Sequence, residues 1–297
     1  MRLPDFIIIG AAKSGTTTLY QYLCRHPQVY MSTPKEPEFF ARDERYAMGM
    51  EWYASLFSNA EPHQVCGEAS TIYTRWPQFP EAAPRISKAL PTVKLIYIMR
   101  HPVERAYSHY VQRIKNAQNT RRQLEVQETF EQRIKKESFF LDSSDYMKQI
   151  EQYIKLFPKE SFLFILMDDL IKNPADTICK VCNFIFIGVD NGMDLVGEKA
   201  IAANQAAYHK EWFMRSRITA PLKKIPGLAG AAALLPQGVR DGAYQVLRQL
   251  PYRQQVEQKY LPQPMLPETR QMLLARFREP NQKLAEFLER DLSHWDK

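Results

Sequence analysis

The chain has 297 residues, of which 45% are hydrophobic and 25% are charged, and these ordinary globular values exclude intrinsic disorder and fibrous repeats. A formal net charge of +7 favours anionic ligands. There is no zinc-finger spacing, basic zipper or aromatic RNA platform, so we expect no nucleic-acid partner.

Membrane and export signals are weak in this sequence. Its most apolar stretch, residues 225–235, is shorter than the roughly 20 residues of a membrane span and contains Pro and Gly. The first ten residues, MRLPDFIIIG, lack the longer apolar core and cleavage site of a signal peptide. We therefore expect a cytoplasmic protein without a transmembrane segment.

Apolar runs predict the strands. Residues 5–10 (DFIIIG), 94–99 (KLIYIM) and 161–167 (SFLFILM) have the composition of buried parallel strands, and residues 65–68 predict a shorter one.

Helical patterns follow most of these strands. They cover residues 18–26, 103–117, 130–137, 146–157, a stretch from Pro174, 267–277 and 281–292. Strands alternating with helices predict an α/β fold with a mostly parallel central sheet flanked by helices and right-handed crossovers. In the run ICKVCNFIF, we expect Cys179 and Cys182 to pack as small apolar side chains of a buried helix.

Residues 216–265 interrupt the alternation. Prolines divide this Ala-, Leu- and Gly-rich stretch at positions 221, 226, 236, 251, 262 and 264. We interpret it as a helical insertion or lid. Because no repeat or low-complexity linker separates it from the rest, we predict a single domain over residues 1–297.

The loop after the first strand has the sequence GAAKSGTTT. Small residues between a strand and a helix let backbone N–H groups surround an anion, and the helix N-terminus adds donors. Lys13 adds a cation beside Ser14 and Gly15, and hydroxyl donors come from Thr16, Thr17 and Thr18. The sequence therefore predicts a phosphate-binding strand–loop–helix at the N-terminus; a plain capped turn is the alternative.

This loop differs from two common nucleotide loops. A Walker loop has its lysine directly after the last glycine, whereas Lys13 precedes Gly15. The dinucleotide fingerprint fails because Ala12 replaces its second glycine. The order K-S-G-T-T instead resembles the 5′-phosphosulfate loop of sulfotransferases that use 3′-phosphoadenosine 5′-phosphosulfate (PAPS).

A second motif follows the strand at 94–99. Arg100, Pro102, Arg105 and Ser108 match the family pattern R-x-P-x-x-R-x-x-S. The resemblance implies that Arg100 and Ser108 bind the 3′-phosphate of PAPS, which suits a guanidinium fork and a hydroxyl. The alternative is a strand-end ion pair for Arg100 and a surface position for Ser108.

The segment STPKEPEFFA resembles the E-x-x-F-F segment of the glycosaminoglycan-type branch of the family. The resemblance implies that Glu36 is the catalytic base, with Glu38 as its nearest rival. A solvated turn, which fits the loop composition P-K-E-P, is the alternative. Phe39 and Phe40 are placed to shield the carboxylate from water, whereas Lys35 would oppose that effect if it pointed inward.

A third segment, CGEASTIYTRWP, is similar to a family segment on the acceptor side, which implies acceptor-side positions for Glu68 and Ser70. Glycosaminoglycan enzymes often carry a lysine where this chain has Ala69, so heparan-like specificity does not transfer directly. A structural role for Glu68 and a histidine base from a distant loop stay open.

The resemblance implies transfer of a sulfuryl group from PAPS, with PAP as product and without a metal. Lys13 would neutralise the oxygen that becomes negative, and the acceptor group would be a hydroxyl or, alternatively, an amine of a carbohydrate, lipid or small metabolite. A nucleotide kinase or other P-loop NTPase and a non-catalytic anion-binding relative are the alternative functions. The sequence identifies neither the acceptor, nor the oligomeric state, nor the loop that closes over the adenosine.

Overall fold

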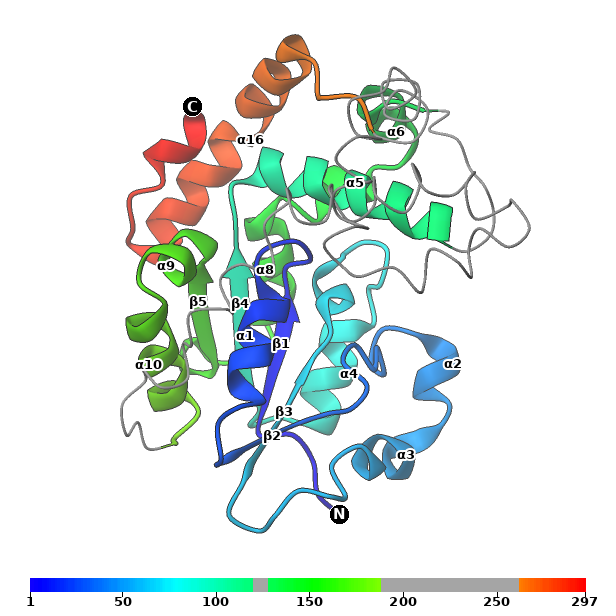
Figure 1. The fold of residues 1–297 in the computed structure, drawn as a ribbon, viewed down its shortest axis with the longest axis vertical. Helices are drawn as coiled ribbons and strands as arrows, with labels where there is room; N and C mark the ends of the chain where they lie inside the picture. The colour runs from blue at the N-terminus through cyan, green and yellow to red at the C-terminus, as the bar shows by residue number, and fades with distance from the viewer. Residues whose placement is uncertain (120–127, 188–261) are drawn as a thin grey trace, which may run out of the picture. The chain divides into compact units, whose positions relative to one another are not determined.

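The computed structural model describes residues 1–119, 128–187 and 262–297. A five-stranded sheet of order β2-β3-β1-β4-β5 lies at its centre (Figure 1), and every strand pairing is parallel. The strands are β1 (Phe6–Gly10), β2 (Val29–Met31), β3 (Val65–Ala69), β4 (Lys94–Met99) and β5 (Phe162–Leu166). The predicted α/β fold is thereby confirmed.

The two central strands are apolar on both sides because each face of the sheet is covered. Side chains of β1 alternate between the faces: Ile7 and Ile9 belong to one core cluster, and Phe6 and Ile8 to the other. A strand that is buried on both faces consists of a continuous apolar run. This is why β1, with the sequence FIIIG, can be predicted from the sequence.

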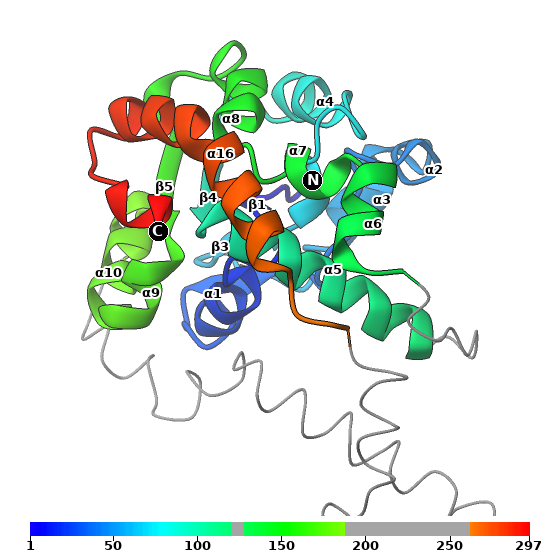
Figure 2. The same ribbon diagram turned by 90° about the horizontal axis from the view of Figure 1, so that it is seen from above.

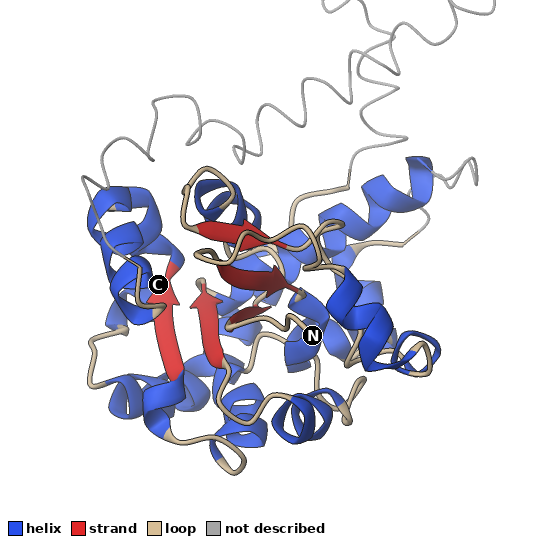
Figure 3. Ribbon diagram, turned by 90° about the horizontal axis from the view of Figure 1, so that it is seen from below, coloured by secondary structure: helices blue, strands red, loops and turns tan. Residues whose placement is uncertain are grey.

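Helices form a layer on each face (Figures 2 and 3). The face of Phe6 and Ile8 packs against α1 (Thr16–Leu23), α9 (Met167–Lys172) and α10 (Pro174–Phe184). The opposite face is covered by α3 (Gly49–Ser55), α4 (Ala82–Ala89), α8 (Tyr146–Ile154) and α16 (Pro267–Leu288). The other described elements are α2 (Asp43–Tyr46), α5 (Pro102–Asn119), α6 (Phe130–Lys136), α7 (Phe139–Asp142), η1 (Thr71–Thr74), η2 (Lys159–Ser161) and η5 (Ser293–Asp296).

The C-terminal helix differs from its prediction. Residues 267–277 and 281–292 were expected to form two helices, but α16 continues through Pro280. A proline inside a helix removes one backbone donor. Leu273, Phe277 and Leu284 remain buried across this point, so packing along one stripe of the helix opposes the break.

Two further sequence interpretations have different outcomes. Cys179 and Cys182 lie on the predicted helix α10; Cys182 is buried as expected, whereas Cys179 is only partly buried. The insertion expected at 216–265 falls almost wholly outside the described residues.

Contact density divides the chain into two compact units. The first comprises Met1–Tyr110, Glu131–Ala200 and Met265–Lys297, and it contains the sheet; the second comprises Val111–Phe130 and Ile201–Pro264. The single-domain organisation stays a prediction. Within the described ranges, none of the helices combines the length and the apolar character that crossing a bilayer requires.

The strand order determines where a ligand can bind. Chain connections leave β1 toward β3 and β2 on one side, and leave β4 toward β5 on the other. Ligands of open α/β sheets bind beyond the carboxyl ends of the strands at such a reversal. The predicted phosphate loop and Arg100 follow these two strands directly.

Candidate active site

The loop between β1 and α1 has an unusual backbone. Lys13 has φ 73° and Gly15 has φ 95°, both in the left-handed region. Residues other than glycine rarely adopt this backbone conformation, and those that do cluster at functional sites. The N–H of Ala11 donates to the carbonyl of Ile98, at 2.8 Å, and so ties the loop to β4.

The second motif meets this loop. Arg100 Nη1 donates to the Lys13 carbonyl oxygen, at 3.5 Å, although the two residues are 87 positions apart. Tyr146, on α8, donates its hydroxyl to the Arg100 carbonyl at 2.7 Å. The two predicted halves of the phosphate site therefore lie together, and Tyr146 fixes the backbone of Arg100.

Arg105 contacts the loop between β1 and α1 from the protein interior. It is fully buried, and its Nη1 donates to the Ala12 carbonyl at 3.4 Å. Its other donors bond Ser144 Oγ, at 2.7 Å, and the Phe140 carbonyl, at 2.6 Å. The motif includes Arg105, but sequence reasoning gave it no task; its contacts identify it as a positioning residue.

The loop has several groups suited to an anion. Ser14 is completely buried, and its hydroxyl makes no hydrogen bond of normal geometry with described residues, although it lies close enough to Tyr146 to affect the pKa of that phenol. The first turn of α1 consists of Thr16, Thr17 and Thr18, and no side chain caps it. Its N–H groups and the buried hydroxyl are suited to phosphate oxygens.

Ser108 lies on α5, on the same helix as Arg105. Its side chain is partly exposed. A hydroxyl in that state is compatible with a ligand contact. The structure does not bring it into direct contact with Arg100, so its phosphate role stays a prediction.

Glu36 is held by the chain that follows β3. Its carboxylate accepts hydrogen bonds from Thr71 N, at 2.7 Å, and Thr71 Oγ1, at 3.1 Å. Lys35 Nζ pairs with it at 2.5 Å, which is the opposing contact considered from the sequence. The backbone of Glu36 is left-handed, with φ 61°. Thr71 could not be found from sequence, because only the pairing of β2 with β3 brings the segment of Glu36 beside it.

Phe39 and Phe40 anchor the segment that carries Glu36. Both rings are fully buried and lie against Tyr53 of α3, with ring centroids 4.6 Å and 5.0 Å away. Aromatic pairs at these separations stabilise a core beyond the area they bury. The E-x-x-F-F pattern therefore contains two anchors as well as its glutamate.

Glu38 is a less available base. Its carboxylate forms an ion pair with Arg42, and its backbone is left-handed, with φ 57°. Its N–H donates to Ser70 Oγ, at 3.1 Å. The structure thus brings Glu38 and Ser70 together through a backbone contact.

Glu68 and Ser70 lie beneath the surface, with no exposed area. Desolvation raises the pKa of the Glu68 carboxyl to about 8, and the nearby hydroxyls of Tyr73 and Tyr53 only partly offset this. A direct acceptor contact of either residue would require movement of the atoms above it.

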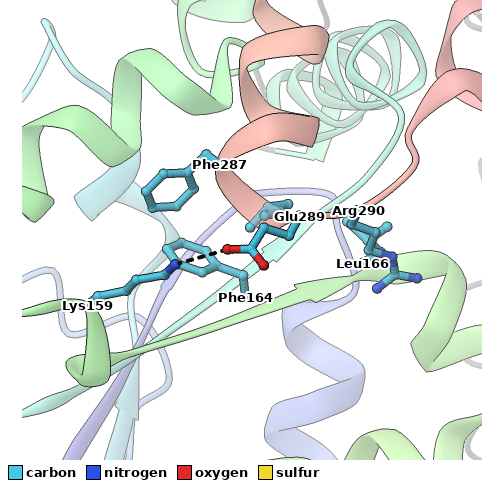
Figure 4. Close-up of a pocket in the computed structure, with 7 residues that line it drawn as sticks. Lys159, Phe164, Leu166, Phe287, Glu289 and Arg290 are labelled. Carbon is cyan, nitrogen blue, oxygen red and sulfur yellow. Dashed lines mark ion pairs between the residues drawn. The ribbon is translucent and has the colours of Figure 1, made fainter.

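A separate cavity of about 350 Å³ lies between β5 and the end of α16 (Figure 4). Its walls include Phe164, Phe287 and Arg290. Lys159 and Glu289 pair across it at 3.8 Å. None of its lining residues is a predicted site residue. In the described part of the chain, no group of three His, Cys, Asp or Glu side chains is arranged to hold a metal; the metal-free reaction stays a prediction.

A loop suited to phosphate follows β1 of a five-stranded parallel sheet, and an arginine follows the adjacent strand β4. These features define the class of protein: an α/β protein with a candidate phosphate-binding site. The chain belongs to the sulfotransferase domain family, which matches residues 3–202. The family expected from the two motifs is confirmed.

Two relatives and one solved structure show the extent of the similarity. The chain is 34% identical over 191 residues to heparan sulfate glucosamine 3-O-sulfotransferase 5 of Mus musculus, covering 62% of this chain and 54% of that protein. It is 43% identical over 111 residues to the membrane-associated sulfotransferase kil1 of Dictyostelium discoideum, covering 36% of this chain and 22% of that protein. The matches thus span about half, or less, of these relatives. The fold is similar to the crystal structure of a sulfotransferase from Alicyclobacillus acidocaldarius, with a TM-score of 0.67, 21% identity and coverage of 100% of both chains.

Proposed function

We propose that this chain transfers a sulfuryl group from PAPS to a hydroxyl group of an acceptor and releases PAP. The contact between Arg100 and the Lys13 carbonyl carries the proposal. It joins two motifs with separate phosphate-binding features at the carboxyl ends of neighbouring strands.

The residues present are compatible with this nucleotide. The buried Ser14 hydroxyl and the uncapped first turn of α1 are donors for a 5′-phosphosulfate. Lys13, Gly15, Thr16, Thr17 and Thr18 complete that loop. Arg100 and Ser108 would bind the 3′-phosphate.

Bound PAPS would supply an activated sulfuryl group, whose bond to the 5′-phosphate breaks as the acceptor oxygen bonds to sulfur. Lys13 neutralises the negative charge that develops on the leaving oxygen. Glu36 accepts the acceptor's proton, and Thr71 and Lys35 hold its carboxylate in one orientation. Arg105 keeps the loop in place from the protein interior.

A carbohydrate hydroxyl is the acceptor that we propose first. The mouse relative is named for transfer to a glucosamine of heparan sulfate. Ala69 departs from the lysine of glycosaminoglycan enzymes, so the acceptor need not be heparan-like. Lipids, small metabolites and amines are the other acceptors to screen, and we propose the cytoplasm as the site of action.

Calorimetry with PAP and a screen with labelled PAPS test the proposal together. We expect PAP binding, followed by label transfer to one acceptor class. Magnesium-dependent ATP turnover would instead indicate a kinase or NTPase. PAP binding without transfer, together with indifference to Glu36→Gln, would indicate a non-catalytic relative.

A further inference from the structure

Glu68 is a buried carboxyl group for which the transfer chemistry above has no task. It is the fourth residue of β3, where it pairs in register with Ile7 of β1. Its side chain has no exposed area, and neither carboxyl oxygen makes a hydrogen bond of normal geometry with described residues. An ionised carboxylate in such a place has a large desolvation cost, so the neutral, protonated acid is the favoured form.

The groups around Glu68 favour the same form. Tyr53 of α3, Tyr73 of η1 and the Ser70 hydroxyl are its polar neighbours, and Glu36 is a like charge that disfavours a second carboxylate. Tyr153 of α8 also interacts electrostatically with it. No cation is among the main influences on its pKa within the described chain. Among the described residues, the main influences on Glu68 therefore include hydroxyls that can share a proton with a neutral acid, but no cation that would pair with a charged one.

The residues directly after Glu68 hold the candidate base. Glu36 donates its N–H to the Ala69 carbonyl, at 3.0 Å. Glu38 donates its N–H to Ser70 Oγ, at 3.1 Å. The Glu36 carboxylate accepts from Thr71 N, at 2.7 Å. Residues 69–71 thus support both left-handed residues of the neighbouring segment.

We propose that Glu68 is a proton-bearing positioning residue: its neutral form holds residues 69–71 beneath Glu36 and Glu38, and its ionisation disturbs that support and lowers turnover. The proton that Glu68 loses passes to solvent, and no covalent step is involved. The effect on turnover rests on the proposed sulfuryl transfer with Glu36 as base. The effect on the segment that contains Glu36 and Glu38 does not depend on that function.

The effect on the segment can be measured without turnover. We would follow the carboxyl carbon of Glu68 and the backbone amides of Glu36 and Glu38 by NMR between pH 6 and pH 9.5. The carboxyl signal is assigned by its loss in Glu68→Gln. We expect it to titrate with a midpoint near the raised pKa of about 8, and both amides to shift with the same midpoint.

Two NMR results would overturn the proposal. One is a Glu68 carboxyl that is already ionised at pH 6, and the other is a pair of amides that do not follow its titration. Tyr53 and Tyr73 cannot produce the expected midpoint, because burial raises their pKa well above the ordinary value. The wild-type carboxyl can also be assigned by selective labelling, so the test does not depend on the folding of Glu68→Gln.

The pH profile of turnover tests the functional half. With the acceptor found in the PAPS screen, we expect wild-type kcat to fall about tenfold per pH unit above the Glu68 midpoint, as for loss of one proton. Glu68→Gln, which keeps a neutral group of similar shape, should retain its own pH 7 rate to higher pH. Glu51→Gln, at an exposed carboxylate of α3, is the matched control and should keep the wild-type profile.

If the kcat of Glu68→Gln fell at alkaline pH in the same way as that of the wild type, the proposed effect of Glu68 on turnover would be wrong. Loss of all turnover in Glu68→Gln, with PAP binding intact, would mean that the ionised form is needed and would also overturn it. If no acceptor is sulfated by the wild type, the proposed function fails, and the NMR titration still decides the role of Glu68.

Discussion

Arg100 supports the loop that contains Lys13, because its guanidinium donates a hydrogen bond to the Lys13 carbonyl. A change at Arg100 therefore removes a cation from the site and a donor from the loop. Lys13 combines a cation with a left-handed backbone, so its side chain and its conformation both matter.

Arg100→Ala should weaken PAP binding by about tenfold to 150-fold, the equivalent of the roughly 1.5–3 kcal/mol of a charged hydrogen bond. Calorimetry measures this directly. Arg100→Lys, which keeps the charge but not the fork, should recover only part of the affinity. Unchanged PAP affinity in Arg100→Ala would remove Arg100 from the site.

Lys13→Ala should lower turnover strongly while changing the melting temperature little, because the residue is on a loop and its charge acts on the leaving oxygen. Lys172→Ala, at an exposed position of α9, is the control for loss of a positive charge. A large fall in melting temperature with normal turnover would contradict the assignment.

Glu36→Gln should leave PAP affinity intact and lower turnover by at least about a hundredfold, in the range of general-base effects. The hydrogen bonds from Thr71 can persist with an amide oxygen, so folding should change little. Normal turnover would transfer the base to Glu38, Glu68 or a histidine.

At the scale of elements, Arg105 joins α5 to the phosphate loop and to α7. Three of its hydrogen bonds go to oxygens, and two of those oxygens are main-chain carbonyls. Such contacts between elements decide where the loop lies, since β1 alone determines only where it begins.

Arg105→Met should reduce the free energy of unfolding by more than about 2 kcal/mol, because buried oxygens lose their donors. PAP binding should weaken as well, since the loop carbonyl at Ala12 is released. Urea unfolding and calorimetry measure the two effects. Normal stability with normal PAP affinity would show that the loop does not need this support.

At the scale of the whole molecule, Glu68 makes stability depend on pH. Its pKa in the folded protein is about 8, above the usual 4.5, so the unfolded chain loses this proton first as the pH rises. Stability from the neutral form is complete below the usual value and is lost as the pH rises to about 8.

The free energy of unfolding of the wild type should therefore fall relative to Glu68→Gln between about pH 4.5 and pH 8, by at most about 1.4 kcal/mol per pH unit, and then level off. Urea unfolding of both proteins across this range measures the difference, in which the other titrating groups cancel. A difference that does not change with pH would show that Glu68 has an ordinary pKa.

The sequence by itself determined the central strands, the phosphate loop and the family. A strand buried on both faces must be apolar throughout, and an anion loop needs small residues and a cation, so both are visible as local patterns. The short strand β2 escaped prediction, because it is recognised only through its pairing with β3. The continuity of α16 through Pro280 likewise depended on the core that its apolar stripe meets.

Only the tertiary structure decided which residues support the candidate site. Thr71 beside Glu36, Tyr146 beside Arg100 and Arg105 beneath the loop are contacts between segments far apart in sequence. The pKa of Glu68 also depends on the removal of water by neighbouring elements. The chemical groups of a local motif can be recognised from the sequence alone. The orientation of those groups and their exposure to water depend on the packing of segments that are distant in sequence.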